Sequence, residues 1–312
     1  RQMRKILGVN ISHDCSFAYF ENGVLKEYYE EARFNKIKHF KPVHPFYQGD
    51  YEYEVLKKFN KITFDAVAFV SHDRGNILIE KAYIDNILKQ IKCNDVKFYI
   101  DEHHLCHSVC GFYFSDFEEA LAISTDEGGE RIENPEFRVM ESIVKINNKS
   151  IKKLYQQASN KKTQYFEESD IVRERDIENK VYGFDLKMTN QLIGGLKYLF
   201  YSVEAGFPQN CEGQLMGIAA YKDKNTNLDK KVLEIAHKAQ EETLEERIQL
   251  IKKAQTYSDC NNIILTGGYH LNCANNFKIV KHFPKLNFFV DPIPYDGGTA
   301  VGAAYYYEKN FK

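Results

Sequence analysis

Tryptophan is absent from this 312-residue chain, and so are several signals that would assign it to a class at once. No apolar run reaches the roughly 18–20 residues that cross a bilayer. The opening residues RQMRKILGVN lack the apolar core of a signal peptide. Lys and Arg total 42 against 44 Asp and Glu, so we expect no general binding to nucleic acid or anionic membrane. A cytoplasmic protein without a membrane partner is therefore expected.

A paired CxxC framework is also lacking. The seven cysteines stand at positions 15, 93, 106, 110, 211, 260 and 273, and this odd, scattered set favours reduced thiols. Cys106 and Cys110 are four residues apart and could ligate a metal, but small buried core thiols are the commoner reading. The 21 Tyr and 22 Phe are spread along the chain, which favours core packing over a base-stacking surface.

The patterns that are present predict an α/β fold. Period-two and apolar runs predict strands at 5–11, 16–34 (a hairpin around Asn22-Gly23), 64–71, 96–100, 119–125, 137–146 and 261–268. Helical spacing predicts helices at 77–92, 103–115, 191–206 and 229–257 and at the Gly/Ala-rich end of the chain. We expect two tightly joined lobes, 1–115 and 116–312. The polar segment 147–190 is expected to form a helical or irregular insertion in the second lobe.

The segment HHLCH at 103–107 is the first candidate site. On a helix, His103 and His107 lie one turn apart on one face, which suits two nitrogen ligands of a divalent metal. His104 and His107 are a second possible pair, and an isolated HxxxH is more often two satisfied histidines. A further ligand is needed. Asp296 is the best candidate because two glycines follow it and allow close approach of a ligand, although Asp-Gly-Gly alone is a turn signal.

Three other turns could carry chemistry. GVNISHDCS (8–16) delivers His13 and Asp14 after a strand, and His13 could act as a general base because imidazole titrates near neutrality. STDEGGE (124–130) and LTGGYHLNCANN (265–276) are glycine-rich turns of the kind that suit phosphates near helix starts. None of the three matches a P-loop or a GxGxxG fingerprint, so none is decisive alone.

Taken together and in order, these segments resemble the carbamoyltransferase family of antibiotic and nodulation-factor biosynthesis. The matching stretches are 6–23, EEARFNKIKH at 30–39, DEHHLCHSVCGFYFSDFEEA at 101–120, 124–130, GFPQNCEGQLMGIAAY at 206–221, 265–276 and PYDGGTAVGAA at 294–304. The amino-terminal domain of that family is similar to the tRNA threonylcarbamoyl-transfer enzymes. The resemblance therefore implies a two-lobed actin/hexokinase-type (ASKHA) ATPase-like fold, with mixed sheets flanked by helices.

The resemblance also implies roles for individual residues. By match, His103, His107 and Asp296 bind a divalent metal, with Fe²⁺ as the family's expected ion. By match, the transfer site contains His13, Asp14, Lys38 and His39. The residues implied to hold ATP or carbamoyl-adenylate are Asn10, Asp126, Gly128, Gly129, Glu212, Gly213, Gly267, Gly268 and Asn272.

The activity implied by the resemblance is O-carbamoyl transfer from carbamoyl-adenylate to a small-molecule hydroxyl acceptor. The metal would act as Lewis acid and Lys38 would offset negative charge. In the family a second, carboxy-terminal domain makes carbamoyl-adenylate from carbamoyl phosphate and ATP. Because this chain ends at Lys312, we expect that domain to be absent here or to be a separate protein partner. A homodimer is compatible with the resemblance.

Two alternatives remain at this point. One is a non-catalytic nucleotide-binding partner or regulator of the same fold. The other is a metal-dependent ATPase or phosphotransferase, although an ordinary sugar kinase needs no histidine metal site.

Overall fold

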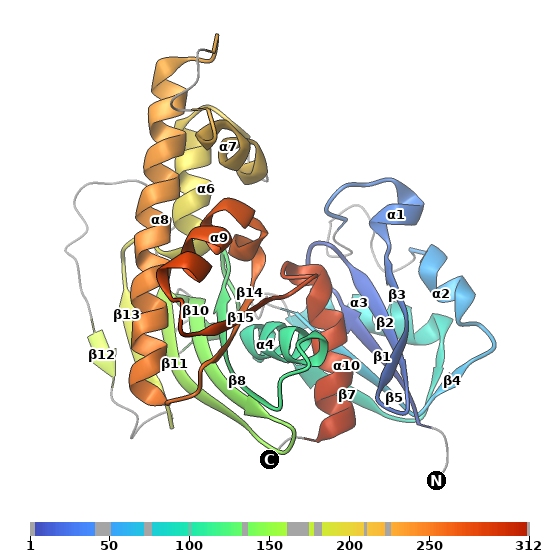
Figure 1. The fold of residues 1–312 in the computed structure, drawn as a ribbon. Helices are drawn as coiled ribbons and strands as arrows, with labels where there is room; N and C mark the ends of the chain where they lie inside the picture. The colour runs from blue at the N-terminus through green and yellow to red at the C-terminus, as the bar shows by residue number, and fades with distance from the viewer. Residues whose placement is uncertain are drawn as a thin grey trace.

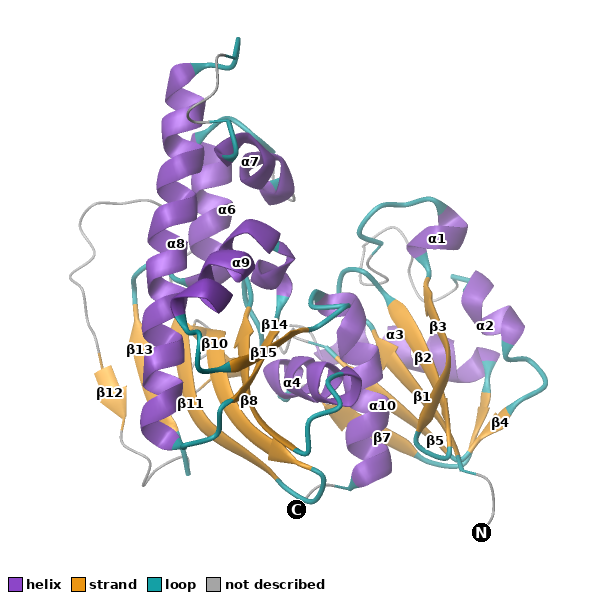
Figure 2. Ribbon diagram, viewed as in Figure 1, coloured by secondary structure: helices purple, strands orange, loops and turns teal. Residues whose placement is uncertain are grey.

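The computed structural model describes residues 4–40, 51–71, 77–99, 101–132, 137–160, 175–177, 183–208, 211–221 and 226–310. Two mixed β-sheets stand next to each other, with helices between them and on their outer faces (Figure 1). Figure 2 shows that both halves of the molecule contain helices as well as strands. None of the helices in the described ranges has the length and apolar character needed to span a membrane.

The first sheet has the strand order β3-β2-β1-β5-β7. Its strands are β1 (Lys5–Asn10), β2 (Ser16–Glu21), β3 (Val24–Glu30), β5 (Ala66–Val70) and β7 (Val96–Tyr99). Asn22 and Gly23 both have positive φ, 54° and 79°, and join the antiparallel strands β2 and β3 as the hairpin signal predicts. Strands β1, β5 and β7 run parallel, so the turn after β1 leaves the sheet at its carboxyl edge.

The second sheet has the order β12-β13-β11-β10-β8-β14-β15, and β9 pairs with β10. Its strands are β8 (Glu119–Thr125), β9 (Arg131–Ile132), β10 (Phe137–Asn147), β11 (Ile151–Ser159), β12 (Arg175–Ile177), β13 (Asp185–Thr189), β14 (Asn262–Thr266) and β15 (Asn287–Val290). Strands β8, β14 and β15 run parallel to one another. The segments that follow these three strands therefore leave the sheet at the same edge.

Smaller elements and outer helices complete both halves. Near the first sheet lie α1 (Ala32–Asn35), α2 (Glu54–Lys58), α3 (Ile77–Gln90) and the strand pair β4 (Thr63–Phe64) and β6 (Lys92–Cys93). The half that contains the second sheet also contains α6 (Gly194–Glu204), α7 (Glu212–Ala219), α8 (Lys230–Tyr257), η2 (Gly268–Leu271) and α9 (Cys273–His282). The apolar stripe of α8, including Leu250 and Ile251, packs on Ile123 and Ile263 of the sheet.

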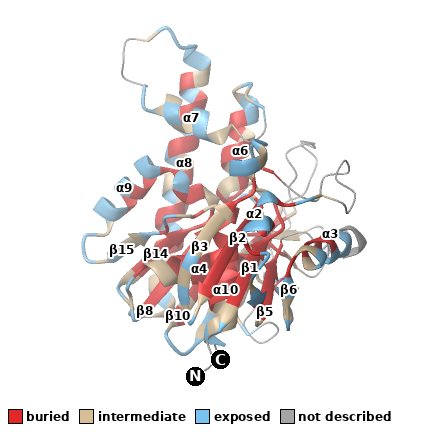
Figure 3. Cartoon of the chain, turned by 90° about the vertical axis from the view of Figure 1, so that its right-hand side faces the viewer, coloured by how far each residue is buried: buried red, intermediate tan, exposed pale blue. Residues whose placement is uncertain are grey.

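Helices α4 (His103–Phe114) and α10 (Thr299–Lys309) lie between the two sheets (Figure 1). A Cβ atom on Gly8 of β1 would stand 1.9 Å from the carbonyl oxygen of Ala300, and one on Gly302 of α10 would stand 1.8 Å from that of Cys106. Only glycine lets the backbones of β1, α10 and α4 approach so closely. Figure 3 shows buried residues concentrated in this layer and in the strands beside it. The short helix η3 (Asp296–Gly298) leads directly into α10.

The α/β architecture with mixed sheets is confirmed, but one expectation for the second half was wrong. Described residues of the segment 147–190 do not form a helical or irregular insertion: they supply β11, β12 and β13 to the second sheet. Within β11, Tyr155 and Ala158 are buried, while Lys152 is exposed. The Lys and Gln residues of β11 hide the strand pattern in the sequence. Pairing with β10 supplies stability that the polarity of these residues does not reveal.

Candidate metal centre and adjoining cleft

The centre of the site is the buried face of α4. His103 and His107 are both fully buried, and their Nε2 atoms lie 3.1 Å apart. The four-residue spacing on a helix produces this arrangement, because it returns the chain to the same face after about one turn. The sequence prediction of this pair is therefore consistent with the geometry.

Two carboxylates, one at the end of β8 and one in η3, complete the cluster. Asp126 directly follows β8, and its Oδ2 lies 3.3 Å from Nε2 of His103 and 3.7 Å from Nε2 of His107. Oδ1 of Asp296 lies 3.4 and 3.6 Å from the same two nitrogens. Candidate ligand atoms of all four residues lie within 4.8 Å of one another. Two imidazoles and two carboxylates form a donor set that Fe²⁺, Zn²⁺ and Mn²⁺ accept in proteins.

The electrostatics of the cluster favour a positive charge beside its two carboxylates. Burial lowers the pKa of His103, yet the carboxylates of Asp296 and Asp126 outweigh it and raise that pKa to about 10. Burial raises the pKa of Asp296, but His13 and His103 hold it well below its usual range. Protons on the imidazoles thus balance two buried carboxylates. A divalent cation would balance the same carboxylates more directly, so the residues fit a metal ion.

His104 does not join this cluster. Its Nδ1 lies 3.2 Å from Oγ of Ser142, and its backbone N–H donates to Glu130 at 3.0 Å. Burial lowers its pKa to about 4, so the ring stays neutral. Cys106 and Cys110 are likewise buried thiols outside the cluster, as the core reading predicts.

A hydrogen-bonded loop holds Asp296 in place. Oγ of Ser12 donates to Oδ2 of Asp296 at 2.7 Å, and Oγ1 of Thr299 donates to its backbone oxygen at 2.6 Å. Oγ of Ser16 donates to the backbone oxygen of Gly297 at 2.7 Å. These bonds tie the loop before α10 to the carboxyl edge of the first sheet. Residues nearly 300 positions apart in the chain therefore share one site.

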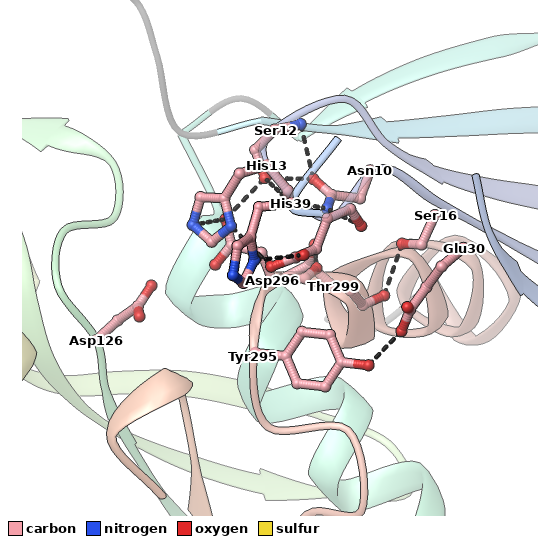
Figure 4. Close-up of polar contacts among 12 residues, drawn as sticks. Asn10, Ser12, His13, Ser16, Glu30, His39, Asp126, Tyr295, Asp296 and Thr299 are labelled. Atoms are coloured by element: carbon pink, nitrogen blue, oxygen red, sulfur yellow. Dashed lines mark hydrogen bonds and ion pairs between the residues drawn. The ribbon is translucent and has the colours of Figure 1, made fainter. Parts of the chain in front are cut away.

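A second polar group adjoins the cluster. Nδ2 of Asn10 donates to the backbone oxygens of His13 and Asp14, which shapes the turn after β1. Oδ2 of Asp14 lies 2.9 Å from Nδ1 of His13, and Oδ1 of Asp14 lies 3.0 Å from Nδ1 of His39. Nε2 of His13 lies 3.2 Å from Oδ2 of Asp296. Figure 4 shows His13 and His39 gathered beside Asp296.

His13 is thus held between two carboxylates. Burial lowers its pKa, but Asp296 and the hydrogen bond that His13 donates to Asp14 outweigh that effect and raise the pKa to about 9. On the far wall, burial and the nearby carboxylates of Glu212 and Asp126 raise the pKa of Glu127 to about 7.

One cavity of about 290 Å³ opens onto both polar groups. Nine of the residues singled out in the sequence line it: His13, Asp14, Lys38, His39, Asp126, Glu212, Gly213, Gly268 and Asp296. His103 and His107 are not part of its lining and lie buried behind the two aspartates.

The other predicted nucleotide-site residues have different surroundings. Asn272 caps α9 by accepting from the backbone N–H of Asn275, and its amide pairs with Gln240. Gly267 packs against the backbone of Thr125 with φ of 87°. Gly129 packs against His104, Gly128 lies near Arg138, and Asn10 is fully buried in its own turn. These five residues do not line the cavity.

Sequence reasoning missed two features of the site. It assigned Asp126 to the nucleotide alone, whereas this carboxylate lies among the candidate metal ligands. It also missed the aromatic wall of Tyr198, Tyr269 and Tyr295. The sequence did contain a signal for Asp126, since this aspartate directly follows a buried strand. It contained no signal that would single out the three tyrosines, because 21 tyrosines are spread along the chain.

The two sheets with their intervening helices define an actin/hexokinase-type, or ASKHA, fold, and three solved structures share it. Full-length HypF in its phosphate- and nucleotide-bound form has a TM-score of 0.61 at 11% identity, covering 98% of this chain and 46% of that one. HypF from T. kodakarensis has a TM-score of 0.56 at 11% identity, covering 98% and 48%. A ROK family protein from Streptococcus pneumoniae in complex with sucrose has a TM-score of 0.53 at 10% identity, covering 98% and 99%. At these identities the likeness shows the fold alone.

Within that fold, the chain belongs to the carbamoyltransferase N-terminus family, whose sequence model matches residues 46–305. This assignment places the chain in a family of transferases. It is also 24% identical over 340 residues to the uncharacterized protein MJ1051 of Methanocaldococcus jannaschii, covering 96% of this chain and 56% of that protein. The chain thus spans about half the length of the curated relative that it matches.

Proposed function

We propose that this chain transfers a carbamoyl group from carbamoyl-adenylate to the hydroxyl of a small-molecule acceptor. The observation that carries the proposal is a single cleft in which Asp126 and Asp296 of the metal-type cluster meet His13, Lys38 and His39. A family described as carbamoyltransferase supports the same chemistry.

His103, His107, Asp126 and Asp296 would hold the divalent ion, with Fe²⁺ as the ion expected from the family. When bound, that ion supplies Lewis acidity toward a phosphate or carbonyl oxygen. The remaining work falls to the residues of the chain. Gly213, which has no atom within 4 Å of its would-be Cβ, leaves room for the adenylate phosphate close to backbone N–H groups, and Gly268 lines the same cavity beside Asp126. Tyr198 and Tyr269 offer an apolar wall to the adenine or ribose.

In the transfer step, the acceptor hydroxyl passes its proton to a base that lines the cleft. The acceptor oxygen forms a bond to the carbamoyl carbon while the bond from that carbon to the adenylate phosphate oxygen breaks. AMP leaves with the bonding electron pair. Lys38 lines the cleft and would offset the negative charge that develops on the departing phosphate or on the carbonyl oxygen. His13, with a carboxylate at each ring nitrogen, suits the same charge-offsetting role better than the general-base role expected from its position in the sequence.

The proposal keeps the division into lobes 1–115 and 116–312, with the cleft between them. His13, Asp14, Lys38 and His39 belong to the first lobe, and the other lining residues belong to the second. Carbamoyl-adenylate would be supplied by a carbamoyl-adenylate-forming domain or protein outside these 312 residues.

The proposal can be tested by supplying the chain with Fe²⁺, a carbamoyl-adenylate-forming enzyme, carbamoyl phosphate, ATP and a panel of hydroxyl compounds. The expected result is a mass gain of one carbamoyl group on an acceptor, lost in the variant Asp296→Asn and kept in His282→Gln, an exposed histidine on α9. AMP binding by calorimetry without any transfer would favour the regulator alternative. Metal-dependent release of phosphate from ATP by the chain alone would favour the ATPase alternative.

A further inference from the structure

His39 has one ring nitrogen engaged and one available. Its Nδ1 lies 3.0 Å from Oδ1 of Asp14, while its Nε2 is buried and has no hydrogen-bond partner in the described part of the chain. A buried polar atom without a partner costs about 1–3 kcal/mol, which an incoming ligand that bonds to it would recover. The arrangement has the form of a base held by a carboxylate, with the second nitrogen left for a substrate.

The backbone at both residues is strained. Asp14 has φ of 58° and His39 has φ of 54°, in the left-handed region that non-glycine residues seldom adopt. Each such residue costs on the order of 1–3 kcal/mol, and such strain clusters at functional sites. Asn10 holds the first of these turns through its bonds to the backbone oxygens of His13 and Asp14. The chain thus maintains an unfavourable conformation at the two residues that form the pair.

Both ring nitrogens of His13, unlike those of His39, lie beside a carboxylate. Its Nδ1 lies 2.9 Å from Asp14, and its Nε2 lies 3.2 Å from Asp296. Both nitrogens are therefore occupied by carboxylates, and an acceptor hydroxyl would have to displace one of them. Of the two histidines that line the cleft, His39 is the one with a nitrogen to offer.

The pair also stands between two cavities. A second cavity of about 580 Å³ shares Asp14, Lys38, His39, Leu271 and Tyr295 with the first. It extends away from the cluster toward α1, where Glu30, Arg33 and Lys36 line it. Two substrates could therefore approach His39, one through each cavity.

We infer that His39, oriented by Asp14, accepts the proton of the acceptor hydroxyl, and that the acceptor enters through the second cavity. This inference rests on the proposed carbamoyl transfer. The acceptor O–H bond breaks and its proton passes to Nε2 of His39. The acceptor oxygen bonds the carbamoyl carbon, the bond from that carbon to the phosphate oxygen breaks, and AMP leaves. His39 is a catalytic residue in this step, and Asp14 is a positioning residue.

The test compares His39→Gly and His39→Gln with wild type in the coupled transfer assay, with AMP affinity measured in parallel. Glycine adopts φ of 54° without strain, so His39→Gly removes the imidazole and leaves the backbone undisturbed. Both variants should transfer about 10²- to 10⁴-fold more slowly while binding AMP as wild type does. Added imidazole should raise the rate of His39→Gly at least tenfold, with a pH profile that follows the free-base form of imidazole. It should not raise the rate of His13→Gly.

The outcomes separate this inference from the proposed function. If wild type transfers no carbamoyl group to any acceptor, the proposed function fails and the role of His39 fails with it. If wild type transfers and His39→Gln or His39→Gly keeps more than a tenth of its rate, only the role of His39 fails. Rescue of His13→Gly instead of His39→Gly would return the base role to His13. The variant His282→Gln, a like substitution at an exposed position, should match wild type throughout.

Discussion

Nε2 of His103 lies 3.1 Å from Nε2 of His107, and both nitrogens lie within 3.7 Å of the carboxylates of Asp126 and Asp296. Two imidazole nitrogens this close to each other and to two carboxylates repel one another through their lone pairs unless a proton or a metal cation binds among them. The four side chains come from α4, from the end of β8 and from η3, so the cluster links the helix layer to the second sheet.

A first prediction concerns metal content. His103→Gln and Asp126→Asn should each lower the affinity for Fe²⁺. The loss should exceed the roughly 10- to 100-fold that is typical when a residue hydrogen-bonded to a metal ligand is replaced. The physical reason is that His103→Gln removes an imidazole nitrogen and Asp126→Asn removes a negative charge from a buried four-residue set. Elemental analysis after anaerobic reconstitution and gel filtration measures the effect.

His104→Gln is the matched control for that experiment, because His104 neighbours the cluster but bonds Ser142 instead. It should retain a full equivalent of metal. Loss of metal from His104→Gln as complete as from His103→Gln would instead favour the His104 and His107 pair that the spacing also allows.

A second prediction concerns the contact between α10 and α4. Gly302→Ala should destabilise the chain by about 1–3 kcal/mol or more, because the added methyl group would overlap the backbone of Cys106. It should also weaken metal binding, since α10 follows η3, which carries Asp296. Urea denaturation measures the change in free energy of unfolding.

Gly217→Ala on α7 provides a like substitution with no atom within 4 Å of the new methyl group. It should be neutral or stabilising by roughly 0.5–1 kcal/mol, because alanine favours a helix over glycine. Equal destabilisation by both variants would show that close packing of α10 is not the cause.

A third prediction concerns acid stability. Burial lowers the pKa of His270 from 6.5 to about 3, so the folded chain keeps this imidazole neutral while the unfolded chain protonates it. Below about pH 6.5 this difference should destabilise the folded state by roughly 1.4 kcal/mol per pH unit, until the folded state also takes up the proton near pH 3. Above pH 6.5 the contribution vanishes.

His270→Gln removes this linkage. Between pH 7.5 and pH 5 its free energy of unfolding should fall by about 2 kcal/mol less than that of wild type. Urea titrations across that range measure the difference, and His282→Gln serves as the exposed histidine control. Parallel pH profiles of wild type and His270→Gln would contradict the burial effect.

A fourth prediction concerns a buried ion pair. Arg247 of α8 and Glu141 of β10 are 1% and 3% exposed and are hydrogen-bonded to each other. Arg247→Met should destabilise the chain by about 3–5 kcal/mol, because it leaves the carboxylate of Glu141 buried without its partner. The double variant with Glu141→Leu should recover most of that loss, whereas an unrecovered loss would mean that packing of Arg247 on Tyr269 dominates. Lys252→Met, at an exposed position of the same helix, should have little effect.

Local patterns predicted much of the fold. The turn at Asn22-Gly23 and the long helix around Leu250 follow from short-range spacing, which depends on backbone geometry alone. The strand around Tyr155 was missed because its stability comes from pairing with β10. The polar residues of the strand do not indicate that such a partner exists. Asp126 was recognised as a site residue, yet its position among the candidate metal ligands depends on where α4 packs.

By itself, the sequence determined that His103 and His107 share a helix face wherever that helix is placed, although it allowed His104 with His107 as a second pair. It also determined the order of the motifs that mark the family. Only the tertiary structure decided which carboxylates face the pair and which histidine of the cleft has a buried ring nitrogen without a hydrogen-bond partner in the described part of the chain. Those relations join residues as far apart as Ser12 and Asp296, and they depend on the close backbone packing of β1, α10 and α4. No spacing along the chain encodes a contact between segments so distant from each other.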